Sequence, residues 1–301
     1  MRIWLTRLSV PPINYISYGA RTMAYETILV SLNDVPRTEA MIDAAALIAK
    51  TYDAHLIGCY VIPAVKIYPE VGFAAPTAVD DTRQQYFKTN IAVVKGRFER
   101  QLRQDGLRGE WRTVDSLYSE VAPSLMEHGR TADLIMVSQI AENPVADIES
   151  ELVENVIMES GRPVLIIPQK GALVEVKSVV AGFNATREAT RALFDGLPLL
   201  RSAKDVRVVW VDPYRERSLS GEMPGAEAAE ALARHGVKAT AEGLAAGDSN
   251  AGEALLKHVN DLGAELLVMG AYAHSRMREY IFGGATRHVL AHANVPVLMS
   301  H

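Results

Sequence analysis

The chain repeats one pattern of short apolar runs and amphipathic stretches, and its two halves match in order. The run at 27–33 (TILVSLN) matches the run at 178–184 (SVVAGFN), and both end in Asn. The run at 133–138 (DLIMVS) matches 265–270 (ELLVMG), and a final apolar strand follows each at a similar distance. Such alternation is typical of βα units on a buried parallel sheet. We therefore predict an α/β protein made of two tandem, open, parallel five-stranded α/β sandwich domains.

The limits of the two domains follow from the repeat. We expect the first domain over 23–170 and the second over 176–301, with a short polar connector between them. The first copy is longer, mostly in the loop at 63–81. A surface excursion is the simplest interpretation of that loop, and a lid or a partner surface is the alternative.

The first 22 residues belong to neither copy. They are broken by Pro11 and Pro12 before any long apolar region develops, so they are too short and interrupted to span a bilayer. We expect residues 1–22 to be a disordered upstream extension and Met23 to be the natural start. A transit peptide is the alternative interpretation.

Composition excludes several classes of partner. A formal net charge of −5 and the absence of a Lys/Arg-rich run give no broad positive field, so we expect no nucleic-acid partner. Cys59 is the only cysteine and lies in an apolar run, which excludes an internal disulfide and a cysteine metal site. We therefore expect a cytoplasmic protein with no membrane partner.

The stretch MGAYAHSRMREYIFGGATRHVL contains the most informative glycines. Gly270 ends an apolar strand, and Gly283 and Gly284 precede the last amphipathic stretch. In an open parallel sheet, ligands bind beyond the carboxyl ends of the strands. Backbone N–H groups at 283–286, with the dipole of the following helix, would face an anion there, and phosphate is the obvious one. The alternative is that these glycines only shape turns.

At this motif the chain resembles the universal stress protein family in a tandem two-domain form, over nearly all of 24–301. The family pattern is G-x2-G-x9-G-[ST], whose amides and hydroxyl hold the phosphates of ATP. Here the four positions are Gly270, Ala273, Gly283 and Gly284, so the second glycine and the hydroxyl residue are replaced. The resemblance implies a Rossmann-like, adenine nucleotide alpha hydrolase-like fold. It also implies ATP, with Mg, as the ligand of a protein of the stress response.

The resemblance also implies where the ribose and the base would lie. The family's ribose-binding Asp corresponds to Asn184, a weaker acceptor that carries no charge, and backbone at Val211 would meet the adenine edge. We therefore expect a weak or vestigial ATP site in the second copy. Its nucleotide-binding residues are Asn184, Val211, Gly270, Ala273, His274, Gly283, Gly284, Ala285 and Thr286.

The first copy departs further from the family pattern. The stretch 138–155 contains no glycine and carries five acidic residues that would repel a triphosphate, namely Glu142, Asp147, Glu149, Glu151 and Glu154. We expect this copy to keep the fold without the site. As subunits do in single-domain relatives, it should pair with the second copy through the final strands PVLIIP and VPVLMS. The chain would then be an intrachain pseudo-dimer, alone or as a homodimer.

The remaining constellations do not predict catalysis. His288 and His292 have i,i+4 spacing but no evident third metal ligand, so no metal is expected. Arg276 and Arg278 could neutralise phosphate or simply be exposed loop charges. The chain has no P-loop and no G-x-S-x-G motif, so we expect no catalytic residues. The open alternatives are a nucleotide-independent interaction protein and a slow ATP-hydrolysing enzyme.

Overall fold

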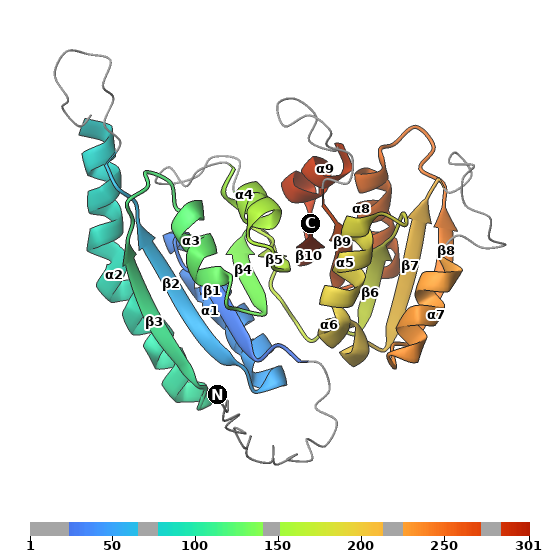
Figure 1. Ribbon diagram of the computed structural model, residues 1–301, viewed down its shortest axis with the longest axis horizontal. Helices are drawn as coiled ribbons and strands as arrows, with labels where there is room; N and C mark the ends of the chain where they lie inside the picture. The colour runs from blue at the N-terminus through green and yellow to red at the C-terminus, as the bar shows by residue number, and fades with distance from the viewer. Residues whose placement is uncertain (1–23, 66–77, 141–150, 213–224, 272–283) are drawn as a thin grey trace, which may run out of the picture.

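The computed structural model describes residues 24–65, 78–140, 151–212, 225–271 and 284–301 (Figure 1). Each half alternates strands and helices, as the repeat predicted. The first half consists of β1 (Thr27–Ser31), η1 (Val35–Arg37), α1 (Thr38–Tyr52), β2 (His55–Ile62), α2 (Ala78–Asp105), β3 (Gly109–Asp115), α3 (Ala122–Gly129), β4 (Leu134–Ser138), α4 (Leu152–Glu159) and β5 (Val164–Ile167). The second half consists of β6 (Ser178–Gly182), α5 (Arg187–Asp195), α6 (Leu197–Ser202), β7 (Asp205–Val211), α7 (Ala226–Arg234), β8 (Ala239–Leu244), α8 (Ala251–Leu262), β9 (Leu266–Gly270), α9 (Gly284–His292) and β10 (Val297–Ser300).

The ten strands form one sheet in the order β3-β2-β1-β4-β5-β10-β9-β6-β7-β8. All neighbouring strands are parallel except β5 and β10, which are antiparallel and join the halves at the centre (Figure 1). At this seam Leu298 is opposite Leu165, with one further pair on either side. The predicted pairing of the two copies through their final strands is therefore confirmed.

Helices cover both faces of the sheet, and this explains the apolar runs of the inner strands. Every residue of β4, β5 and β10 is buried, because side chains on both sides of these strands meet a helix layer. The outer strands β3 and β8 have one neighbour each and mix half-buried with exposed residues. Their sequences, GEWRTVD and ATAEGL, contain no continuous apolar run. The sequence analysis therefore predicted five strands per copy but did not locate the third strand of either copy.

The two copies share side-chain contacts as well as topology. Asp133, just before β4, accepts hydrogen bonds at 2.9 Å from the two backbone N–H groups at the start of β1. Glu265, just before β9, accepts from the N–H groups of Lys177 and Ser178 at 3.1 and 2.6 Å. An acidic side chain thus ties the first strand to the fourth at the same place in each copy.

The apolar core is continuous across the seam. Leu165 and Leu298 belong to the core on one face of the sheet, and Ile166 and Val297 belong to the core on the other. The Tyr25 hydroxyl also donates to the carbonyl of Asp195 in the other half at 3.0 Å. The two halves therefore pack as one body.

The predicted domain limits, 23–170 and 176–301, stay predictions. Residues 168–177 link β5 to β6 without a helix or strand. The expected extension at 1–22 and most of the loop at 63–81 lie outside the described residues. Among the helices that the structure describes, none has the length and apolar character needed to cross a membrane.

Cys59 offers a direct test of core packing. It is fully buried in β2, and burial raises the pKa of its thiol to about 12, with a smaller opposing effect from Arg112. We expect the folded protein to be inert toward a disulfide reagent at pH 8, because the thiolate is the reactive form. In denaturant one thiol per chain should react. Rapid reaction of the folded protein would contradict this burial.

Candidate functional site

Strand order reverses between β6 and β9 in the second half, and the carboxyl ends of these strands face the amino termini of α5 and α9. Crevices at such switch points are the usual ligand sites of open α/β sheets. The predicted residues Asn184, Val211, Gly270 and Gly284 all lie at this edge of the sheet.

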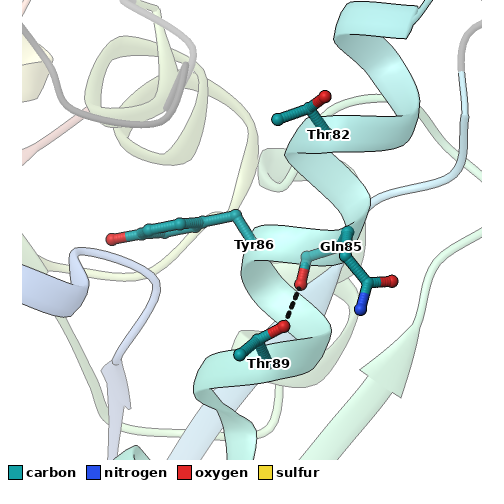
Figure 2. Close-up of a pocket in the computed structure, with 4 residues that line it drawn as sticks. All are labelled: Thr82, Gln85, Tyr86 and Thr89. Atoms are coloured by element: carbon teal, nitrogen blue, oxygen red, sulfur yellow. Dashed lines mark hydrogen bonds between the residues drawn. The ribbon is translucent and has the colours of Figure 1, made fainter.

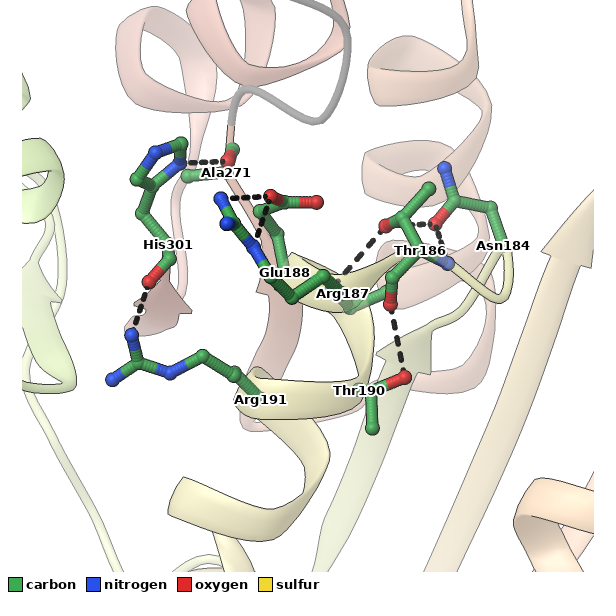
Figure 3. A network of polar contacts seen from close by, with 9 residues as sticks. Asn184, Thr186, Arg187, Glu188, Thr190, Arg191, Ala271 and His301 are labelled. Atoms are coloured by element: carbon green, nitrogen blue, oxygen red, sulfur yellow. Dashed lines mark hydrogen bonds and ion pairs between the residues drawn. The ribbon is translucent and has the colours of Figure 1, made fainter.

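Asn184 lies two residues beyond β6 and is exposed. Its Oδ1 accepts hydrogen bonds from the hydroxyl and the N–H of Thr186, at 2.8 and 3.4 Å (Figure 3). Thr186 caps α5, its Oγ1 accepting from the N–H of Ala189. The Asn184 carboxamide is therefore held at the start of α5, on the solvent side of the sheet edge.

Val211 presents its backbone toward the space beyond β6. Residues of a parallel strand direct their N–H and C=O groups alternately to one neighbour and then the other. The carbonyl of Val209 accepts from the N–H of Phe183 on the β6 side, while the N–H of Asp212 donates to Leu244 on the β8 side. Val211 thus faces the β6 side, where β6 has ended, and no partner from the described parts of the chain meets its N–H or C=O there.

Gly270 has a packing role. A Cβ added there would lie 2.3 Å from the backbone nitrogen of Ala189 and 2.5 Å from the carbonyl carbon of Glu188. Real Cβ atoms do not approach backbone so closely, so only glycine lets α5 begin against the end of β9. The sequence analysis offered an anion cradle or a turn for Gly270 and did not foresee this packing role.

The first turn of α9 contains Gly284, Ala285 and Thr286. Gly284 is exposed, and no atom of the described residues lies within 4 Å of a Cβ added there, whereas Thr286 is only 3% exposed. Ala285 packs against α8, where a Cβ added to Gly252 would lie 2.4 Å from the Ala285 carbonyl oxygen. Sequence reasoning missed Gly252, because its importance comes from a contact between two helices.

The other predicted residues, Ala273, His274 and Gly283, lie outside the described residues, as do Arg276 and Arg278.

Comparison with known proteins identifies the second half. The model of the universal stress protein family matches residues 175–301. This half of the chain belongs to the universal stress protein family. No curated protein matches the chain in sequence.

Solved structures extend the likeness of fold to both halves. A universal stress protein from Archaeoglobus fulgidus DSM 4304 is 14% identical, with a TM-score of 0.67 over 92% of this chain and 99% of its own. A functionally unknown protein from Pseudomonas aeruginosa PAO1 is 17% identical, with a TM-score of 0.57 over 92% of each chain. A universal stress protein in complex with cAMP is 20% identical over 49% of this chain and all of its own, with a TM-score of 0.34. The first two show that the tandem fold occurs in other chains of similar length.

The universal stress protein domain also holds an ion pair that the sequence did not reveal. Arg187 opens α5, and its Nε and Nη2 lie 3.0 and 2.7 Å from Oε1 of Glu188. The Arg187 side chain is 73% exposed and that of Glu188 only 8% (Figure 3). The pair lies between the Asn184 turn and Ala271, so a buried carboxylate orients an exposed guanidinium at this edge. In sequence, both residues look like an ordinary first helical turn.

The histidines of α9 face each other. The rings of His288 and His292 stack at 4.3 Å, and Nδ1 of His292 lies 2.9 Å from the carbonyl oxygen of His288. Within the described ranges, no group of three or more His, Cys, Asp or Glu side chains is placed to hold a metal ion.

Proposed function

We propose that the universal stress protein domain binds an adenine nucleotide weakly, at the carboxyl ends of β6, β7 and β9. The observation that carries this proposal is the backbone of Val211, whose N–H and C=O meet no partner from the described residues, at the same edge of the sheet as Asn184 and Arg187. The output would be a regulated interaction in a cytoplasmic stress response. The net charge of −5 and the single buried cysteine are compatible with that compartment.

Each group suits one part of a nucleotide. A backbone N–H and C=O side by side match the acceptor and donor on the edge of adenine. The exposed Asn184 carboxamide can bond a ribose hydroxyl. The Arg187 guanidinium and the amino terminus of α9 both favour negative charge, so they would face the phosphates.

The departures from the family motif account for weak binding. An alanine held at positive φ costs about 1–2 kcal/mol, and a lost charge-assisted hydrogen bond costs about 1.5–3 kcal/mol. Each ~1.4 kcal/mol changes Kd tenfold. Ala273 and Gly284 stand where these two contributions would arise. Because Thr286 is buried, its hydroxyl is a poor substitute for the one missing at Gly284.

We expect the double variant Ala273→Gly, Gly284→Ser to bind ATP with Mg at least about tenfold more tightly than the natural protein. Among the described residues, no atom lies within 4 Å of the Cβ position at 284, so they leave room for a serine. Isothermal titration measures both Kd values, and AMP and cAMP extend the ligand series.

Gly96→Ser is the matched control, because Gly96 also has open space but lies on α2, in the first half. It should leave Kd unchanged, whereas Arg187→Gln should weaken binding by the natural protein. If neither the natural protein nor the double variant binds any of these nucleotides, the proposal fails. The nucleotide-independent interaction protein then becomes the better description.

A further inference from the structure

The first half contains the same two positions that would meet ribose and base in the second. In the first half Thr27 pairs with His55, and in the second Ser178 pairs with Asp205. Six residues further along these strands lie Asn33 and Val61 in one half, and Asn184 and Val211 in the other. Asn33 is therefore equivalent to Asn184, and Val61 to Val211.

The two asparagines are used differently. Asn33 is 2% exposed, and its Nδ2 donates to the carbonyl of Val61 at 2.7 Å. The Val61 N–H donates to Asn33 Oδ1 at 3.0 Å. One carboxamide thus supplies the donor and acceptor pair that the edge of a base would supply. Asn184 is exposed instead, and its Oδ1 accepts from Thr186. The Asn184 side chain therefore does not bond the backbone N–H and C=O of Val211.

We propose that the first half retains a nucleoside-binding position that its own Asn33 side chain closes. This inference rests on the proposed function, because Val61 is assigned a base only by its equivalence to Val211, which the proposed function places at the adenine edge. Natural protein would then bind one ligand per chain, and removing the carboxamide would admit a second.

An open pocket of about 610 Å³ lies beside α2 in the first half, and Figure 2 shows its lining residues. The residues are Thr82, Gln85, Tyr86 and Thr89. Gln84 Nε2 donates to the carbonyl of Pro63 at 3.2 Å, which ties this part of α2 to the chain just after β2. The hydroxyl of Tyr60, the residue before Val61, donates at 3.0 Å to the carbonyl of Phe87, the residue after Tyr86, so the pocket lies beside the end of β2. An aromatic ring with hydroxyl and amide groups suits a nucleoside.

The ligand class is an uncharged nucleoside, because protein groups fill the end of β4 where phosphates would lie. Gln169 Nε2 donates to Ser138 Oγ at 3.2 Å and to Asp34 Oδ2 at 3.3 Å. The Gln169 N–H donates to Oε1 of the buried Gln139 at 2.8 Å. A carboxylate at Asp34 and another at Glu151 would also repel a phosphate.

Titration with adenosine tests this inference through stoichiometry. We expect Asn33→Ala and Asn33→Ser, which both remove the carboxamide, each to bind one equivalent more than the natural protein, that is, two instead of one. Asn260→Ala is the control, because Asn260 is exposed on α8 outside both proposed sites, and it should gain none. Adding Tyr86→Ala to Asn33→Ala should remove the extra equivalent if it sits in the pocket beside α2. Thermal melting followed by circular dichroism shows which variants are folded.

Asn33→Ala leaves two buried backbone groups of Val61 unpaired, so it is the variant more prone to unfold. Asn33→Ser also removes the carboxamide but keeps a small polar group at the position, and it carries the test in that case. A folded Asn33 variant with no more equivalents than the natural protein overturns the inference. If the natural protein binds neither adenosine nor the nucleotides of the first experiment, the proposed function fails, while a gain from none to one in the variant still supports the closed position.

Discussion

Gly270→Ala should destabilise the second half severely, by about 3 kcal/mol or more, since overpacking against rigid backbone exceeds the usual range for side chains. The new Cβ would lie 2.3 Å from the backbone nitrogen of Ala189, so α5 would have to move away from β9. That movement would disturb Ala192 and Leu193, which are buried on α5. Urea denaturation of the natural protein and the variant measures the loss.

Gly284→Ala is the matched control for this change. It alters another glycine of the same motif, where nothing lies within 4 Å of the added Cβ. Its free energy of unfolding should stay close to that of the natural protein. Equal, small effects at both positions would show that α5 can shift freely, and the packing role of Gly270 would be wrong.

Leu298→Ala should lower the free energy of unfolding by about 2–5 kcal/mol, the range for deleting a buried leucine. Leu298 is completely buried at the seam opposite Leu165, and its core contains residues of both halves. Hydrogen exchange should therefore accelerate in β4 and β5 of the first half as well as in β9 and β10. Faster exchange confined to the second half would contradict a shared core.

Two further variants sharpen the test of the seam. Leu298→Met conserves volume and should cost less than about 1.5 kcal/mol. Leu165→Ala combined with Leu298→Ala should cost less than the sum of the single changes, because the two side chains are direct cross-strand neighbours.

The sequence predicted the inner strands because burial on two faces demands continuous apolar runs, and it predicted the seam through the family resemblance. It could not locate β3 and β8, since an edge strand with one partner tolerates polar residues such as Glu110 and Glu242. Asn184 and Val211 came from the family resemblance, and both lie at the carboxyl ends of the strands, while their role in binding stays a prediction.

The contacts within the site were beyond sequence reasoning, because they depend on how the chain leaves each strand. Asn33 and Asn184 are the same residue at the same position, yet the next residue is Asp34 at φ −78° in one half and Ala185 at φ +56° in the other. That turn decides whether the carboxamide meets Val61 or the cap of α5. Gly252 likewise matters only through a helix that lies far along the chain.

The β5–β10 seam is formed within one polypeptide, and this removes its dependence on concentration. Two separate subunits joined by so short a ladder would come apart on dilution, but the ten-residue link at 168–177 keeps these partners together at any abundance. The two copies are also always made in equal number and always meet each other. One copy can therefore carry a closed ligand position, as we propose for Asn33, without any risk of assembling two closed copies.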